Sequence, residues 1–257
     1  MGYWPPTNEM LRPWSTNPEQ NPDGWIGRDW GGYGYDVYAF FPEFPPDGDP
    51  TDDAIGDPGA VGSPEFPLRV DYQATSADFW QLVSTYQPVI MVTTSRGGAI
   101  GWEVEALEGG HGVGNPGPPH LDWSSDQHGA DLLPTEATVD AASWDAISTY
   151  RQGQTLPSQL PIDAIVTATD ALGLTNVQID RTGTSGNFLS GFLGLHGVYY
   201  NAIAEHNVAA GHIHVGFGLP VADASVLIDT TLHAVLQAFP ASGVPCSPPP
   251  RAKPKPR

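Results

Sequence analysis

Basic residues are scarce in this sequence. Lysine and arginine number 10 against 29 aspartates and glutamates, which gives a formal net charge of −19 at pH 7 and a pI of about 4.4. The only lysines, Lys253 and Lys255, stand near the C-terminal end of the chain. Proteins that bind nucleic acid carry clustered Lys and Arg side chains that displace counterions. The composition therefore argues against nucleic acid as a partner.

Cysteines and long apolar runs are also few or missing. With Cys246 as its single cysteine, the chain forms no intrachain disulfide and no cysteine-based zinc site. No apolar stretch reaches the roughly 18 residues of a membrane-spanning helix. The first residues have neither a basic start nor an apolar run, so we expect no signal peptide and a cytoplasmic protein, although a mature secreted chain would look the same.

Glycine and proline, by contrast, are abundant. They number 30 and 27 of 257 residues, and 40% of the chain is hydrophobic. These proportions predict one sizeable core whose elements are joined by long irregular loops. We expect residues 1–35 to form a Trp-rich N-terminal extension, residues 36–239 to form the domain, and residues 240–257 to form a Pro-rich, basic, disordered tail.

Hydrophobic periodicity predicts that strands and helices alternate along the chain. The predicted strands cover residues 36–41, 66–70, 89–92, 176–180 and 212–216, and the predicted helices cover 77–86, 161–173, 188–204 and 223–239. Ser76 would cap the first helix, and residues 45–64 and 107–134 would be loops. This order favours an α/β fold, a three-layer α/β/α sandwich with a mostly parallel twisted sheet, whose functional groups gather at the carboxyl ends of the strands.

Ser190 is the first candidate for chemistry. It follows a glycine-containing turn at the start of the predicted helix 188–204, where a hydroxyl lies near backbone N–H groups that stabilise an oxyanion. Ser185 is the rival nucleophile. The stretch differs from the G-x-S-x-G turn of α/β-hydrolases, and a serine with only a capping or packing role would look the same.

Two histidines and a carboxylate are further candidates. His212 and His214 alternate on a predicted strand and therefore face the same side, where one is suited to act as a general base, or both to hold a metal ion. Glu103, in the stretch 97–105 beyond strand 89–92, is placed to orient a histidine, with a solvated acidic residue as the alternative. A nearby loop carries metal-compatible side chains whose spacing matches no known zinc or calcium motif, namely His111, His120, Asp122, Asp126 and His128.

Taken in order, these segments resemble pyroglutamyl peptidase I, a family of cysteine peptidases that remove N-terminal pyroglutamate. Residues 184–191 are similar to the family's T-A-G-T-F-V-C-N, residues 211–215 to G-F-I-H-V-P, and residues 100–106 to I-T-x-E-R-V-A. Residues 155–165 resemble the segment that ends in S-T-L-P-x-K-A, and residues 39–44 are a poor match to T-G-F-E-P-F. The resemblance covers about residues 36–239 and implies a fold of the phosphorylase/hydrolase type.

The resemblance implies a catalytic triad of Ser190, His214 and Glu103, in which Ser190 replaces the nucleophilic cysteine. It also implies a peptide or small amide as substrate, no cofactor and no metal, and it leaves a homo-oligomer open. The family's L-G-Q-A-G-G-R loop is replaced by residues 91–98, so specificity would have changed from pyroglutamate. The residues expected to bind substrate are Phe41, Phe44, Thr93, Arg96 and Gly97.

In the resulting hypothesis, His214 removes the proton of Ser190, which attacks an amide carbonyl, while Glu103 orients the imidazole. Backbone N–H groups around Arg96–Gly98 and at the start of helix 188–204 would receive the oxyanion. A hydroxyl needs this base more than a thiol does, since a thiol with a pKa near 8.5 is partly ionised at neutral pH.

Several alternatives remain open from the sequence. The serine is native to a working Ser-His-Glu hydrolase, or it is an engineered Cys-to-Ser change, or it marks a catalytically weak or inactive binding protein on the same scaffold. A metal-dependent hydrolase that uses His212, His214 and the 107–134 loop is the remaining alternative.

Overall fold

The computed structural model describes residues 5–41, 72–109, 155–181 and 189–243. Its centre is a four-stranded sheet in the order β1-β6-β2-β5, with β1 at Ile90–Arg96, β6 at Ala209–Val215, β2 at Trp102–Glu105 and β5 at Val177–Asp180. β1 is parallel to β6 and β2 is parallel to β5, whereas β2 and β6 are antiparallel. The predicted α/β class with a mostly parallel sheet is confirmed.

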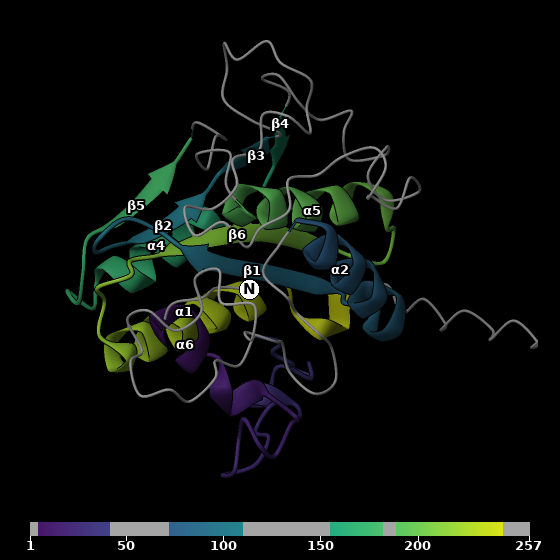
Figure 1. Cartoon of the computed structure of the whole chain (residues 1–257), viewed down its shortest axis with the longest axis horizontal. Coiled ribbons are helices and arrows are strands. Elements are labelled where there is room, and N and C mark those ends of the chain that lie inside the picture. Colours follow the sequence, from purple (N-terminus) through teal and green to yellow (C-terminus); the bar gives the residue numbers. More distant parts are fainter. Residues whose placement is uncertain (1–4, 42–71, 110–154, 182–188, 244–257) are drawn as a thin grey trace, which may run out of the picture.

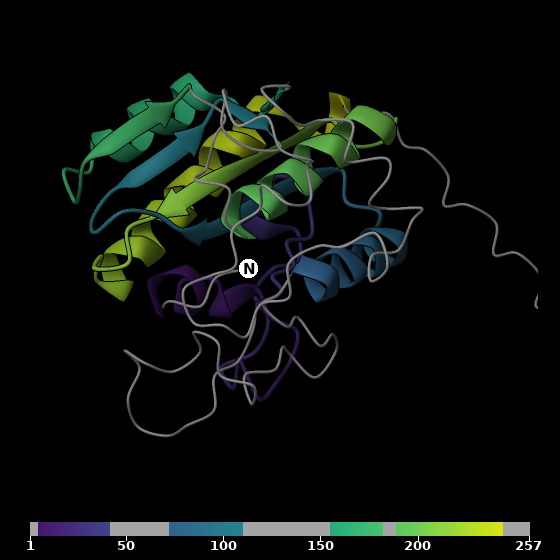
Figure 2. The same ribbon diagram turned by 45° about the horizontal axis from the view of Figure 1, so that its top comes forward.

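Helices cover both faces of this sheet (Figure 1). On one face, α5 (Leu189–Ile203) lies along β6 and β1, with α2 (Tyr72–Tyr86) packed beside it (Figure 2). On the other face lie α6 (Val221–Ala238) and α4 (Ile162–Asp170). A small antiparallel pair, β3 (Leu107–Gly109) and β4 (Thr155–Pro157), contacts α5. Among the described helices, none combines the length and the apolar content needed to cross a bilayer.

The main hydrophobic core lies between the sheet and α6. Ile213 and Val215 of β6 are fully buried and belong to one cluster with Leu227 and Val235 of α6. Because successive residues of a strand point to opposite faces, the alternate residues of β6, His212 and His214, face the α5 side. The alternation of β6 therefore separates its apolar packing residues from its two histidines.

The N-terminal segment contributes directly to this core. α1 (Pro5–Glu9) packs on α6, and two short 3-10 helices follow, η1 (Arg12–Trp14) and η2 (Trp30–Gly32). They bring the buried rings of Trp14 and Trp30 edge to face, with centroids 5.7 Å apart. A further 3-10 helix, η4 (Ala241–Gly243), follows α6. The Trp-rich extension is thus, in its described part, a component of the core of the molecule.

One predicted strand and one predicted helix start are wrong. Residues 36–41 form no strand, because the N–H groups of Val37 and Ala39 donate to the carbonyls of Gly27 and Trp14 in place of a neighbouring strand. α2 begins at Tyr72, so Ser76 lies inside the helix and its hydroxyl binds His196 Nε2 at 3.0 Å. The predicted strand 66–70, loop 45–64, most of loop 107–134 and the end of the tail lie outside the described residues.

Candidate active site

The sheet face beneath α5 carries a row of polar side chains. The strand register pairs Thr93 with His212, Ser95 with His214, and His214 with Glu103. Paired residues on neighbouring strands point to the same face of a sheet, so β1, β6 and β2 each bring polar groups to this face. The sequence prediction that His212 and His214 share a face holds in this arrangement.

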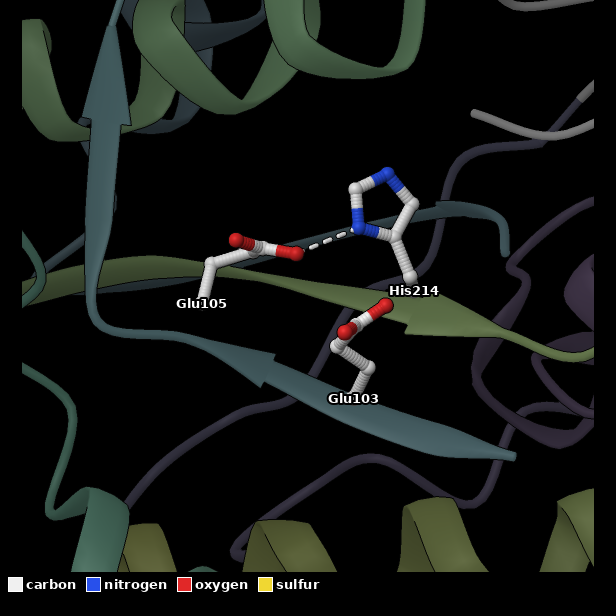
Figure 3. Close-up of side chains that lie close together, drawn as sticks. All are labelled: Glu103, Glu105 and His214. Atoms are coloured by element: carbon white, nitrogen blue, oxygen red, sulfur yellow. Dashed lines mark hydrogen bonds and ion pairs between the residues drawn. The ribbon is translucent and has the colours of Figure 1, made fainter. Parts of the chain in front are cut away.

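His214 hydrogen-bonds a buried carboxylate, which belongs to Glu105. Its Nδ1 lies 2.6 Å from Glu105 Oε1, and the two side chains are 7% and 1% exposed (Figure 3). Because an ionised carboxylate only accepts hydrogen bonds, His214 Nδ1 carries the proton and donates it, which leaves the lone pair of Nε2 as a base. Nε2 lies on the opposite side of the ring (Figure 3), and no described residue hydrogen-bonds it.

The environment of Glu105 makes its carboxylate a strong partner for a cationic imidazole. Burial raises the pKa of Glu105, and the negative charges of Asp180 and Glu103 raise it further, while the hydrogen bond and charge of His214 lower it. Its second oxygen, Oε2, is buried and has no hydrogen-bond partner among the described residues. Charges in such surroundings are poorly screened, so the Glu105 carboxylate interacts strongly with the polar groups beside it.

Glu103, the orienting carboxylate expected from the sequence, lies directly opposite His214 in the strand register. Its Oε1 accepts a hydrogen bond from Gln178 Nε2 of β5 at 2.7 Å, and the hydrogen bond to His214 comes from Glu105 instead. The expected contact between Glu103 and the imidazole is therefore corrected to Glu105. The alternation of Trp102–Glu105 places both carboxylates on one face, a signal that was present in the sequence but did not distinguish between them.

The hydrogen bonds of His212 explain why Glu105 binds His214 and not His212, the residue opposite it. Continuing the register places Glu105 opposite His212, but the ring of His212 already binds Thr93 Oγ1 through Nδ1 and Ser95 Oγ through Nε2, each at 2.7 Å. Thr93 Oγ1 also donates to the Gly211 carbonyl at 3.2 Å, so it accepts from Nδ1–H, and Nε2 accepts from Ser95.

The same network keeps His212 neutral. Burial lowers the pKa of His212 well below its usual value, and the charge of His214 lowers it further. Both ring nitrogens are engaged, so His212 offers no lone pair to the metal ion that one alternative assigned to it. Thr93 was expected to contact the substrate, but its hydroxyl hydrogen-bonds His212. The sequence did not reveal this role.

Ser190 lies in the first turn of α5 and is half-buried. Ser190, Gly194 and Gly197 are spaced i, i+4 and i+7, so they share one face of the helix. A Cβ added at Gly197 would lie 3.4 Å from Thr93 Cγ2, and one at Gly194 would lie 2.6 Å from Glu108 Cδ. Gly194 lets α5 lie close to Glu108 of β3, and Gly197 lies next to Thr93 of β1. Half-buried Ser190 lies near the helix N-terminus, where N–H groups lack intrahelical acceptors.

Two further predicted residues, Arg96 and Gly97, lie at the carboxyl end of β1. The guanidinium of Arg96 stacks on Phe217, 4.6 Å from the ring centroid. The N–H of Gly97 donates to the Val215 carbonyl at 2.7 Å, so this amide is not a donor for an oxyanion, contrary to expectation. A Cβ at Gly97 would lie 3.0 Å from His214 Cβ, so glycine permits the close approach of the two chain segments.

Of the two phenylalanines expected to contact the substrate, the structure describes Phe41. Phe41 is fully buried, with Arg12 stacked over its ring at 5.7 Å and its carbonyl accepting from Gln20 Nε2. It is therefore packed within the N-terminal segment. Phe44 and Ser185 lie outside the described residues.

The site also has the dimensions of a metal centre. Ligand atoms of Glu103, Glu105 and His214 lie within 4.8 Å of one another. Two carboxylates and an imidazole suit zinc. A metal bound through Nδ1 would displace the proton that His214 donates to Glu105, whereas a metal bound through Nε2 would leave that hydrogen bond in place.

Comparison with solved structures finds pyrrolidone carboxyl peptidases and pyroglutamyl peptidase I. The chain is similar to pyrrolidone carboxyl peptidase from Thermococcus litoralis, with 14% identity and a TM-score of 0.48 over 66% of this chain and 76% of that one. A mutant of the Pyrococcus furiosus enzyme has 13% identity and a TM-score of 0.49, over 66% of this chain and 79% of that one. Pyroglutamyl peptidase I from Bacillus amyloliquefaciens has 16% identity and a TM-score of 0.46, over 65% of this chain and 74% of that one.

No family model and no curated protein sequence matches the chain. Sequence identities of 13–16% and TM-scores of 0.46–0.49 indicate a distant similarity of fold and nothing further.

Proposed function

We propose that this protein is a hydrolase of amide or peptide bonds, with Ser190 as nucleophile, His214 as general base and Glu105 as the orienting carboxylate. The observation that carries the proposal is the buried hydrogen bond from His214 Nδ1 to Glu105, which leaves Nε2 as a base on the face that α5 covers. The resemblance of residues 184–191 and 211–215 to the pyroglutamyl peptidase motifs supports the same roles for Ser190 and His214.

The proposed reaction passes through an acyl-enzyme. Ser190 Oγ attacks the carbonyl carbon as His214 Nε2 takes its proton, and Glu105 balances the charge of the resulting imidazolium. N–H groups in the first turn of α5 stabilise the oxyanion. His214 then donates the proton to the amine nitrogen as the carbon–nitrogen bond breaks. Water, deprotonated by the same Nε2, hydrolyses the ester and restores Ser190.

The test is turnover of pyroglutamyl-aminomethylcoumarin and of simple acyl and peptidyl anilides. Ser190→Ala and His214→Ala are each expected to lower kcat by at least about a thousandfold, because nucleophile and base act as one unit. Ser185→Ala is the matched control and should retain turnover. Ser190→Cys would test the likeness to the cysteine peptidases, since a partly ionised thiol needs less help from the base. Full activity of Ser190→Ala would contradict the proposal.

A metal-dependent hydrolase is the second candidate, and the cluster of Glu103, Glu105 and His214 favours it over the version built on His212. It predicts that chelation abolishes turnover and that zinc restores it. The serine mechanism predicts turnover that resists chelation and depends on Ser190. If neither occurs and a peptide binds saturably without being cleaved, the binding-protein alternative is favoured.

A further inference from the structure

A cavity of about 590 Å³ lies along β1, next to the candidate site. Its walls come from residues 34–40, from α2, from β1 with the residues just before it, and from α5 and α6. This volume falls within the range of small-molecule sites, about 300–1,000 Å³. Around Leu193 its side chains are apolar, namely Phe79, Leu82, Val83 and Met91, whereas polar groups line it elsewhere, namely those of Asp36, Tyr38, Tyr86 and Gln87.

The cavity begins within one helical turn of the proposed nucleophile. Leu193 lines it and follows Ser190 by three positions on α5, a spacing that places the two Cβ atoms about 5–6 Å apart. Thr93 also lines it, and its hydroxyl binds His212, whose ring centroid is 4.7 Å from that of His214. Ser190, His212 and His214 do not line the cavity themselves, so Leu193 and Thr93 are the residues that connect it to the nucleophile and to the histidine pair.

The part of the cavity around Leu193, the part that lies next to the proposed nucleophile on α5, favours an apolar occupant. The hydroxyl of Thr93 is engaged by His212 and by the Gly211 carbonyl. A small polar lactam ring such as pyroglutamate would have to give up its hydration among apolar side chains, which is costly without replacement hydrogen bonds. An alkyl or aryl chain would instead gain the free energy of leaving water.

We infer that this cavity receives a large alkyl or aryl group on the acyl side of the substrate. The acyl group stays bonded to Ser190 Oγ after the amine leaves, so a chain that extends past Leu193 is held through both halves of the reaction. The substrates are then amides of apolar carboxylic acids, or peptides with a large apolar residue before the cleaved bond. This inference rests on the proposed function.

The experiment measures kcat/KM for the 4-nitroanilides of acetic, butanoic, hexanoic and octanoic acids. Each added methylene should raise kcat/KM about fourfold until the cavity is filled, as expected from the transfer of one methylene out of water. Leu82→Trp, which places a large side chain into the cavity from α2, should flatten this series. Ser84→Trp is the matched control, because Ser84 is exposed on the same helix and does not line the cavity, and it should leave the series unchanged.

The outcomes separate this inference from the proposed function. Turnover that does not depend on chain length, or that Leu82→Trp leaves unchanged, overturns the inference while the hydrolase stands. If no anilide is cleaved, the proposed function fails, and calorimetric titration with octanoate and butanoate tests the cavity alone. Tighter binding of octanoate that Leu82→Trp abolishes supports an apolar-chain site, whereas equal or absent binding of the two acids overturns it.

Discussion

At the scale of single residues, the site depends on how the two histidines of β6 are partnered. His212 lies between two hydroxyls from β1, which hold a neutral ring. His214 hydrogen-bonds the Glu105 carboxylate of β2, and Glu103 of the same strand lies close by. Two imidazoles only two residues apart therefore have different chemistry, because the strands on either side of β6 offer different groups.

The choice between the two glutamates gives the sharpest prediction at this scale. Glu105→Gln should lower kcat by about 10³–10⁴-fold, because an amide that donates to Nδ1 favours the tautomer in which Nε2 carries the proton. Glu103→Gln, the isosteric control two residues away, should change kcat less than about tenfold. Both variants are compared by kcat and its pH profile, and a larger loss in Glu103→Gln would restore the assignment expected from the sequence.

His196 of α5 predicts a pH dependence of stability. Its ring binds the Phe192 carbonyl through Nδ1 and Ser76 through Nε2, and burial lowers its pKa to about 4. Between that value and the ordinary histidine pKa near 6.5, only the unfolded chain binds a proton there, so stability falls as the pH falls through this window. The loss from His196 by pH 5 is on the order of 2 kcal/mol, and His212 acts in the same direction.

The measurement is urea unfolding at pH 7.5 and pH 5.0, in the parent chain and in His196→Gln. The variant lacks a group that titrates in this range, so its free energy of unfolding should change less between the two pH values. An equal pH dependence in both proteins would show that His196 does not cause the effect.

At the scale of elements, the close approach of α5 to the sheet determines where Ser190 lies. Gly194→Ala is expected to destabilise the fold by about 1–2 kcal/mol, because the overlap with buried Glu108 exceeds the gain in helix propensity. Gly197→Ala meets Thr93 at an ordinary contact distance, so it should be neutral or slightly stabilising. Chemical denaturation of both variants tests this, and equal stabilities would contradict the packing described for α5.

The same scale shows why some elements were predictable from the sequence. α4 and α5 each have a continuous apolar pattern with clear ends, and their bounds lie close to those predicted. Residues 36–41 have the composition of a strand, yet their amides bind the N-terminal turns, a tertiary preference that local sequence does not contain. β2 was missed because its pattern, Trp-Glu-Val-Glu, is short and half acidic. Without β2 as a strand, the choice of Glu105 over Glu103 could not be made.

At the scale of the whole molecule, the N-terminal segment completes the core. Trp14 is 3% exposed within the main cluster, so Trp14→Ala should cost about 3–5 kcal/mol. Trp25, half-buried and stacked on Tyr38 at 4.9 Å, is the control, and Trp25→Ala should cost about 1 kcal/mol. Small and equal losses of unfolding free energy in both variants would mean that the segment lies on the surface of the domain and adds little to its core.

The homo-oligomer that the resemblance leaves open and the cytoplasmic location stay predictions.

The central claim is that Ser190 is activated by His214 with the help of buried Glu105. The most direct measurement is labelling of the folded protein with a fluorophosphonate, followed by peptide mapping in a mass spectrometer. We expect one modified residue, Ser190, with labelling at least a hundredfold slower in His214→Ala and in Glu105→Gln. Modification of Ser185 or Ser95 in place of Ser190, or an unchanged rate in His214→Ala, would contradict it.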